Sequence, residues 1–367
     1  MSVVDIHTHM YPPSYISLLQ SRYDGAGSAV PYIRTFEDAP DDPRLIILPD
    51  EDAKGGRGRP VGPEYWSVEQ KIAFMDTHNI ETSVVSLANP WLDFLSGFES
   101  PTWAAKINDD FEAICASHSP RLFFFGVLPL SGPPLTIIAE IKRLQTLKYA
   151  RGVVIGTTGL GRGLDDPEMG KIWEALEETN TFVFLHPHYG LPSSVYGSRA
   201  SEYGHVLPLA LGFPMETTIA VARMWISCVW DRYPGLQILL AHAGGAIPSL
   251  AGRLQSCLEH DGHLRGNGKE EGPKRTIQEV LKQNIYLDAV VYGEVGISAA
   301  VGLVGKDRVM FGTDHPFFPP LGADEKEWLS VRTNYDAIQE AFTDEQDQDA
   351  KGVLGGNAIK VLRLQVD

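Results

Sequence analysis

The sequence has few cysteines and no long apolar run. Only three of its 367 residues are cysteine (Cys115, Cys228 and Cys257), and no short spacing links them. This pattern indicates neither a disulfide framework nor a thiolate metal site, and it favours a reducing compartment. No apolar run approaches the length of a membrane span. No basic segment precedes the first apolar stretch, which begins close to Met1. A signal peptide is therefore not expected, and a cytoplasmic protein is predicted.

Positive charge is also scarce. The chain has 31 Lys and Arg against 47 Asp and Glu, which gives a formal net charge of −16 at pH 7. Such an acidic chain is not expected to bind nucleic acid or an anionic membrane. An anionic substrate would need a local arginine or a metal ion to overcome the general negative field.

Eight short apolar segments alternate with segments of helical pattern. They are almost continuously apolar, as parallel strands buried on both faces are. No glycine-rich phosphate loop follows the first segment, which argues against an open doubly wound sheet. The pattern predicts an α/β protein with one domain over residues 1–367, a (β/α)8 TIM barrel with long insertions after strands one and five. The predicted strands are residues 3–9, 82–87, 122–127, 152–156, 182–186, 236–241, 285–288 and 308–312.

The first insertion, residues 10–62, is rich in Pro, Gly and Asp and is predicted to be irregular. The second insertion covers residues 187–214. Between them, Ser67 is predicted to cap a helix that carries Val68, Ile72 and Met75 on one face. Further helices are predicted near residues 103–117, 134–146, 167–178, 215–232, 247–259, 276–282, 333–343, 345–353 and 356–363.

The first predicted strand ends in the pattern His-x-His, formed by His7 and His9. Side chains alternate along a strand, so both imidazoles lie on the same side. Three later strands also end in possible metal ligands, namely His186, His242 and Asp314. These strand ends meet at the mouth of a barrel, where the ligands are expected to converge. Imidazoles combined with a carboxylate suit zinc.

These motifs resemble the amidohydrolase superfamily, and more narrowly its decarboxylase branch. That branch includes the aminocarboxymuconate-semialdehyde decarboxylases, the γ-resorcylate decarboxylases and the fungal isoorotate (uracil-5-carboxylate) decarboxylases. The similarity to the last group extends over nearly the whole chain and includes loops as well as strands. The stretches that carry it include Asp5–Tyr15, Ser86–Trp91, Phe184–Tyr196, Glu202–Met224 and Met310–Pro320.

The resemblance implies that His7, His9, His186 and Asp314 bind one divalent metal, zinc rather than manganese or magnesium, with no organic cofactor. Many hydrolytic relatives hold a second metal with a lysine after strand four, where residues 155–158 here read Ile-Gly-Thr-Thr. His242 is implied to face the metal centre without being a firm ligand and to polarise a metal-bound water or a substrate carbonyl. Asp314 is implied to act as acid/base as well as ligand, because removing CO2 from an sp² carbon requires a proton delivered to that carbon.

The resemblance also implies a set of substrate contacts. Arg59 would bind the substrate carboxylate, Asn89 the amide edge of the pyrimidine, and Phe213 and Phe317 would flank the ring. His188 is a further candidate, although Pro187 leaves its direction open. Two other residues have less certain roles: Asp288 would orient a ligand or cap the next helix, and Arg253 would reach a neighbouring subunit.

The expected function is non-oxidative decarboxylation of uracil-5-carboxylate, a small pyrimidine carboxylate, by a homodimer or homotetramer. Three alternatives stay open at this point. The substrate could be another ring acid of the γ-resorcylate, methylsalicylate or aminocarboxymuconate-semialdehyde type. The protein could be a mononuclear-metal lactonase or amidohydrolase, in which His242 and Asp314 activate water. A non-enzymatic metal-binding scaffold is the third alternative, and the presence of Asp314 and Arg59 argues against it.

Overall fold

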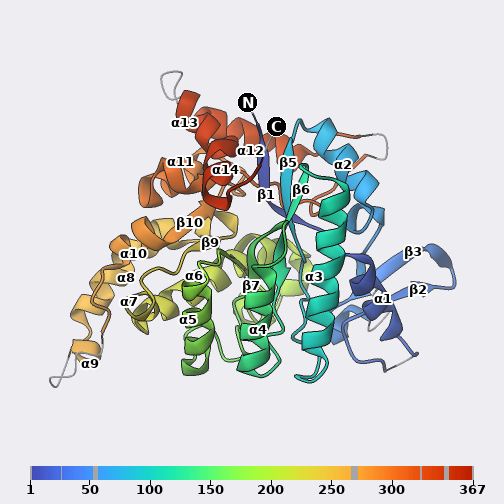
Figure 1. Ribbon diagram of the computed structural model, residues 1–367, viewed down its shortest axis with the longest axis horizontal. Helices are drawn as coiled ribbons and strands as arrows, with labels where there is room; N and C mark the ends of the chain where they lie inside the picture. Colours follow the sequence, from blue (N-terminus) through green and yellow to red (C-terminus); the bar gives the residue numbers. More distant parts are fainter. Residues whose placement is uncertain are drawn as a thin grey trace.

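The computed structural model describes residues 2–25, 27–52, 57–265, 272–322, 325–342 and 347–365. Eight parallel strands form one sheet in the order β1-β5-β6-β7-β8-β9-β10-β11, and helices surround these strands (Figure 1). This confirms the eight predicted strands and their order. The strands are β1 (Val4–His9), β5 (Thr82–Ser86), β6 (Leu122–Val127), β7 (Ala150–Gly156), β8 (Val183–His186), β9 (Ile238–Leu240), β10 (Ile285–Asp288) and β11 (Val309–Met310).

The first and last strands meet at a seam that closes the barrel. Strand β11 is only two residues long, so closure depends on the segment that follows it. There the N–H of Asp314 donates to the carbonyl of His7 at 2.8 Å, and the N–H of His9 donates to the carbonyl of His315 at 2.7 Å. Thr8 and His315 also form an isolated parallel bridge. The seam therefore lies at the residues predicted to bind metal.

The strands are apolar because helices cover their outer face while their inner face fills the barrel. All six residues of β6 are buried. Its Phe124 stacks on Phe111 of α3 (Ser100–Ser117), with ring centroids 5.5 Å apart. This packing holds the barrel wall in place and leaves the strand ends free to carry polar groups.

Helix α2 (Val68–Thr77) begins as predicted, with the Ser67 side chain accepting a hydrogen bond from the N–H of Gln70. Helix α11 (Glu294–Val304) was not predicted, because its sequence is apolar or small almost throughout and shows no polar face. The other helices beyond the first insertion are α4 (Pro134–Leu144), α5 (Gly170–Glu178), α6 (Phe213–Ile226), α7 (Val229–Arg232), α8 (Ile247–His260), α9 (Gly262–Arg265), α10 (Ile277–Asn284), α12 (Leu329–Ala341), α13 (Asp347–Lys351) and α14 (Asn357–Leu362). No helix of the described residues has the length and apolar character that a membrane crossing requires.

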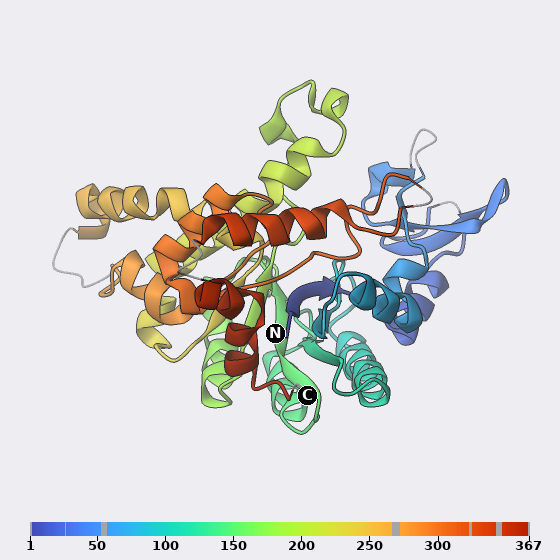
Figure 2. The same cartoon turned by 90° about the horizontal axis from the view of Figure 1, so that it is seen from above.

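The first insertion is not irregular, contrary to the prediction. It contains α1 (Pro13–Ser21) and an antiparallel sheet of β2 (Tyr32–Phe36), β3 (Ala39–Ile46) and β4 (Arg59–Pro60). The prolines misled the prediction: Pro40 and Pro43 lie in β3 but outside its registered pairs with either neighbour. Proline is tolerated at such positions because no ladder N–H is needed there. Figure 2 shows this sheet beside the barrel.

The second insertion follows β8 and contains only short turns before α6. These are η4 (Ser193–Tyr196), η5 (Ala200–Tyr203) and the π-helical η6 (Pro208–Gly212). The insertion projects away from the barrel in Figure 2, where it is yellow-green. Its exposed apolar side chains are Val195, Val206, Leu209 and Leu211.

Candidate metal centre

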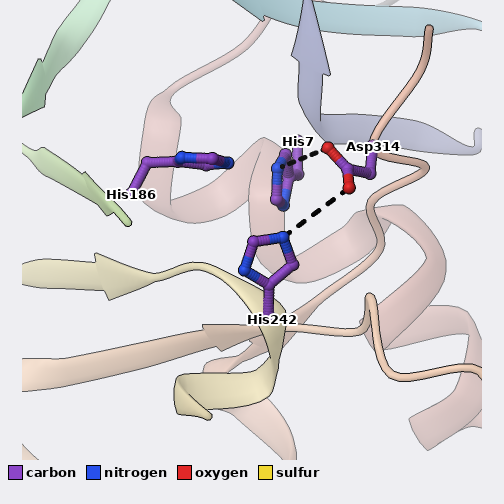
Figure 3. A group of neighbouring side chains, drawn as sticks. All are labelled: His7, His186, His242 and Asp314. Carbon is purple, nitrogen blue, oxygen red and sulfur yellow. Dashed lines mark ion pairs between the residues drawn. The ribbon is translucent and has the colours of Figure 1, made fainter. Parts of the chain in front are cut away.

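Four side chains from four strand ends converge at the mouth of the barrel. His7 belongs to β1 and His186 to β8, while His242 and Asp314 follow β9 and β11. One possible ligand atom of each lies within 4.8 Å of the other three. Figure 3 shows His7 and His242 directed toward the Asp314 carboxylate, with His186 on the other side of His7. Residues more than 300 positions apart thus form one group.

His9 flanks this group. Its Nε2 lies 3.3 Å from Asp314 Oδ1, and its ring centroid is 5.1 Å from that of His7 and 5.0 Å from that of His186. All four predicted ligands are therefore neighbours. His242, which was not predicted to be a ligand, lies in the same group as His7, His186 and Asp314. That His9 binds the metal stays a prediction.

Several atoms at the centre are buried without a hydrogen-bond partner. Unsatisfied buried polar atoms cost free energy, and native proteins seldom contain them without a reason. A cation coordinated by these lone pairs would satisfy all of them at once, and imidazole nitrogens with a carboxylate oxygen form a donor set that suits a divalent transition metal. The atoms are His7 Nε2, His9 Nε2, His186 Nε2 and Asp314 Oδ1.

The other nitrogen of each of the three buried rings is held by a hydrogen bond. Such contacts fix the ring orientation and tautomer of metal-binding histidines. They leave Nε2 of every ring facing the centre. The pairs are His7 Nδ1 with Asp288 Oδ2 at 2.5 Å, His9 Nδ1 with Ser86 Oγ at 3.0 Å and His186 Nδ1 with the carbonyl of Pro187 at 2.8 Å.

Asp288 orients two parts of the centre. Besides His7, its carboxylate accepts hydrogen bonds from the N–H groups of His242 at 2.9 Å and Ala243 at 2.8 Å. Helix α11 begins only at Glu294, so Asp288 orients a ligand and does not cap the helix. His242, Ala243 and Asp314 have φ values of +55°, +52° and +59°. Left-handed backbone at non-glycine residues is strained, and here Asp288 holds part of it in place.

The electrostatics of the centre favour a bound cation. Burial alone would lower the pKa of His7, but the carboxylates of Asp314 and Asp288 raise it to about 10. Burial lowers the pKa of His9 to about 4 and holds that of His186 well below its usual value. Burial would raise the pKa of Asp314, but His7, His242 and His9 keep it well below its usual value. Two carboxylates thus attract positive charge to a place where two imidazoles stay neutral.

Two predicted substrate residues lie on the side of the centre next to His9. The Phe317 ring is edge-on to His9 at 5.7 Å and to Tyr65 at 5.9 Å. Arg59 donates from Nε and Nη2 to Glu51 Oε1, at 3.0 and 2.9 Å. Its positive charge partly offsets the burial that raises the pKa of Tyr65. Arg59 and Phe317 therefore have Tyr65 as a common neighbour.

The other three predicted substrate residues are engaged within the protein. The Asn89 amide donates to the carbonyl of His188, and His188 Nε2 lies 2.9 Å from Asp93 Oδ2. Phe213 is half-buried at the start of α6, close to Gly190, where a Cβ would lie 3.1 Å from its ring. Their roles in substrate binding stay predictions.

Sequence reasoning missed several residues around the centre. Trp91 lies between His186 and His188, with ring centroids 5.9 and 4.8 Å away. Tyr292 follows β10, and burial together with the charges of Asp314 and Asp288 raises its pKa. Both residues follow the ends of strands, and this position was the one feature of the sequence that could have identified them.

Glu216 links the segment that follows β7 with the segment that follows β8. Its carboxylate accepts hydrogen bonds from Thr157 Oγ1 and from the N–H groups of His188 and Gly190. Thr157 directly follows β7, at the position noted for its missing lysine. Glu216 thereby ties the end of β7 to the start of the second insertion.

Comparisons with known proteins agree with this geometry. A family model described as amidohydrolase matches residues 4–364. The chain belongs to the amidohydrolase family. The match covers the barrel, both insertions and every residue of the metal centre, which confirms the predicted family and fold.

Three similar proteins are decarboxylases. IDCase from Metarhizium anisopliae, solved in its apo form, is 52% identical with a TM-score of 0.92, and the match covers 99% of this chain and 97% of that chain. The 2-amino-3-carboxymuconate-6-semialdehyde decarboxylase of Dictyostelium discoideum is 25% identical over 98% of this chain and 91% of that protein. The 5-carboxyvanillate decarboxylase of Novosphingobium aromaticivorans, solved with bound manganese, is 25% identical over 82% of each chain, with a TM-score of 0.69.

Proposed function

We propose that this protein is a metal-dependent decarboxylase that converts uracil-5-carboxylate (isoorotate) to uracil and CO2 without an organic cofactor. The observation that carries the proposal is the 52% identity to IDCase over nearly the whole of both chains. The group of His7, His186, His242 and Asp314 supports it, because decarboxylation of a ring carbon needs an electrophilic centre beside a proton donor.

The group fits one divalent ion, and we propose zinc. Manganese is the main alternative, since it is bound in the 5-carboxyvanillate decarboxylase. When bound, the ion would supply Lewis acidity toward the carbonyl and carboxylate oxygens of the substrate. His7, His186 and Asp314 would hold it, together with His9 or His242.

The reaction replaces a carboxylate on C5 by a proton. Protonation makes C5 tetrahedral and leaves the carboxylate β to the C4 carbonyl. When the bond from C5 to the carboxylate carbon breaks, its electron pair returns to the ring and CO2 departs. The protein must therefore deliver one proton to C5 and stabilise negative charge near C4.

Asp314 and His242 would carry out these two tasks. Their side chains are 9% and 15% exposed, whereas that of His7 is not exposed at all. They therefore reach the space that a substrate can enter. Asp314 Oδ2 lies 3.6 Å from His242 Nε2, which is longer than a hydrogen bond, so a proton would pass between them only once the two side chains move closer. Asp314 would carry it to C5, while His242 would donate a hydrogen bond to the carbonyl oxygen.

The remaining residues would bind the substrate. Arg59 would attract its carboxylate, which a chain with a net charge of −16 otherwise repels. Because Arg59 also pairs with Glu51, its guanidinium would have to bind Glu51 and the substrate carboxylate together. Phe317, beside His9, would contact one side of the ring, and Phe213 would contact another side. Asn89 and His188 would complete the pocket near Trp91.

We further propose a cytoplasmic homodimer or homotetramer. The exposed apolar side chains of the projecting second insertion support self-association, because clustered apolar surface usually marks an interface. Light scattering of the purified protein would give the mass directly, and a monomer at micromolar concentration would contradict this proposal.

The function is tested with purified protein and uracil-5-carboxylate, following uracil by chromatography and metal by elemental analysis. We expect uracil, about one divalent ion per chain, loss of activity after chelation and its return with added zinc or manganese. If uracil-5-carboxylate stays intact although the metal site is full, the assignment of the fold stands and the assignment of the substrate is wrong. Ring acids such as 5-carboxyvanillate and γ-resorcylate, and then lactones, would be tried next.

A further inference from the structure

Lys71 is buried directly behind the metal centre. It belongs to α2, which covers the barrel from outside, and its side chain is fully buried. Within the described residues, Lys71 is the only lysine or arginine that is buried. Burying an amine costs free energy unless hydrogen bonds replace its water. The position of these hydrogen bonds therefore indicates why the lysine is there.

Both hydrogen-bond partners of Lys71 are sequence neighbours of metal-centre residues. Its Nζ lies 2.7 Å from Thr8 Oγ1 and 2.5 Å from His315 Nδ1. Thr8 stands between His7 and His9 on β1, and it points outward because the side chains of a strand alternate. His315 directly follows Asp314. One amine thus connects the segment that carries two histidines with the segment that carries the carboxylate.

The contact lies at the seam of the barrel, where the sheet is weakest. The Thr8 hydroxyl, which accepts from Lys71, donates to the carbonyl of His315 at 3.2 Å. On the other side of the same turn, Thr313 donates from Oγ1 to Asp5 Oδ2 at 2.7 Å and accepts from the N–H of His315 at 3.1 Å. Since β11 has only two residues, these side chains replace a longer strand ladder.

We propose that Lys71 is a positioning residue that sets the distance between the His7–His9 segment and Asp314, and so sets the affinity of the centre for its metal. A role in core packing alone would not need an amine, because methionine fills the same volume without a buried polar group. The proposal rests on the metal site of the proposed function, but it is independent of the substrate.

The test measures zinc affinity by competition with a chromophoric chelator, and the thermal unfolding midpoint of the metal-free protein. The variants are Lys71→Met, Thr8→Val and Thr8→Ser. Met75→Leu is the control for a change of packing on the buried face of α2. We expect Lys71→Met and Thr8→Val to weaken zinc binding about 10- to 100-fold, as is usual when groups that orient ligands are lost. Thr8→Ser keeps the hydroxyl and should stay within about threefold of the parent, as should Met75→Leu.

A lower unfolding midpoint with unchanged zinc affinity in both Lys71→Met and Thr8→Val would overturn the proposal and leave Lys71 a structural role. If Lys71→Met does not fold, the Thr8→Val and Thr8→Ser pair decides, because valine and threonine have the same shape. A parent protein without zinc affinity would overturn this proposal together with the metal centre. A parent that binds zinc but leaves isoorotate intact would overturn the substrate alone.

Discussion

The floor of the metal centre and its rim are built in different ways. The floor consists of His7, His9, His186 and Asp288, which lie on the ends of barrel strands and are buried. The rim, formed by Arg59, Phe213, Phe317 and Tyr292, lies on the insertions and on the loops after the strands. Arg59 and Tyr292 are 36% and 37% exposed. The floor is suited to fixing a metal, and the rim to recognising a substrate.

This difference explains how the same barrel can act on different substrates. Every floor side chain has its outer atoms held by hydrogen bonds, so its geometry is determined by the strands. The rim residues lie on insertions and loops, where substitutions are tolerated more readily than on the strands of the barrel. Two of the similar proteins are named for different substrates, 5-carboxyvanillate and 2-amino-3-carboxymuconate-6-semialdehyde, and the 5-carboxyvanillate decarboxylase shares its fold with this chain. The reaction would thus be decided at the floor and the substrate at the rim.

The largest effect should come from Asp314→Asn, which changes the chemistry of the metal centre itself while keeping the shape of the side chain. We expect kcat/KM for isoorotate to fall by about 1000-fold or more, because both a ligand charge and the acid/base group are lost. The rate of uracil formation measures this fall in kcat/KM. The control for the loss of one charge is Asp336→Asn, on the exposed face of α12. A variant that keeps a tenth of the parent activity would contradict the role of Asp314.

Asp288→Asn should have a smaller effect, because it changes the support of the floor and leaves the ligands in place. The carboxylate that holds His7 and helps raise its pKa would be gone. We expect zinc affinity to fall about 10- to 100-fold, with most of kcat recovered at saturating zinc. Zinc titration of activity distinguishes this from Asp314→Asn, which excess zinc should not rescue. Equal rescue of both variants would remove the distinction between support and chemistry.

The smallest effect should come from the rim, in Arg59→Met. We expect KM for isoorotate to rise about 10- to 100-fold, since a hydrogen bond to a charged group contributes about 1.5–3 kcal/mol. Zinc affinity should not change. Arg57→Met is the matched control, because Arg57 lies two residues away and pairs with exposed Asp38. A change in zinc affinity in Arg59→Met, or an equal rise in KM in Arg57→Met, would show that floor and rim are not separable here.

The barrel was predictable because its signals are local. Buried parallel strands need continuous apolar runs, and His-x-His at a strand end places two imidazoles on one side whatever the rest of the fold does. The antiparallel sheet of the first insertion was missed because proline usually argues against a strand, whereas β3 contains Pro40 and Pro43 outside its registered pairs. Helix α11 was missed because its residues show no polar face.

The eight strands and the candidate ligands at their ends could be predicted from the sequence, because each of these signals depends on residues close together in the chain. Three features depend on the tertiary structure: His242 lies in one group with His7, His186 and Asp314, Asp288 holds His7, and Lys71 connects Thr8 with His315. The contacts of Asp288 with His7 and of Lys71 with Thr8 and His315 join residues from 63 to 281 positions apart. They exist because the barrel closes, and no local pattern records how its first and last strands meet.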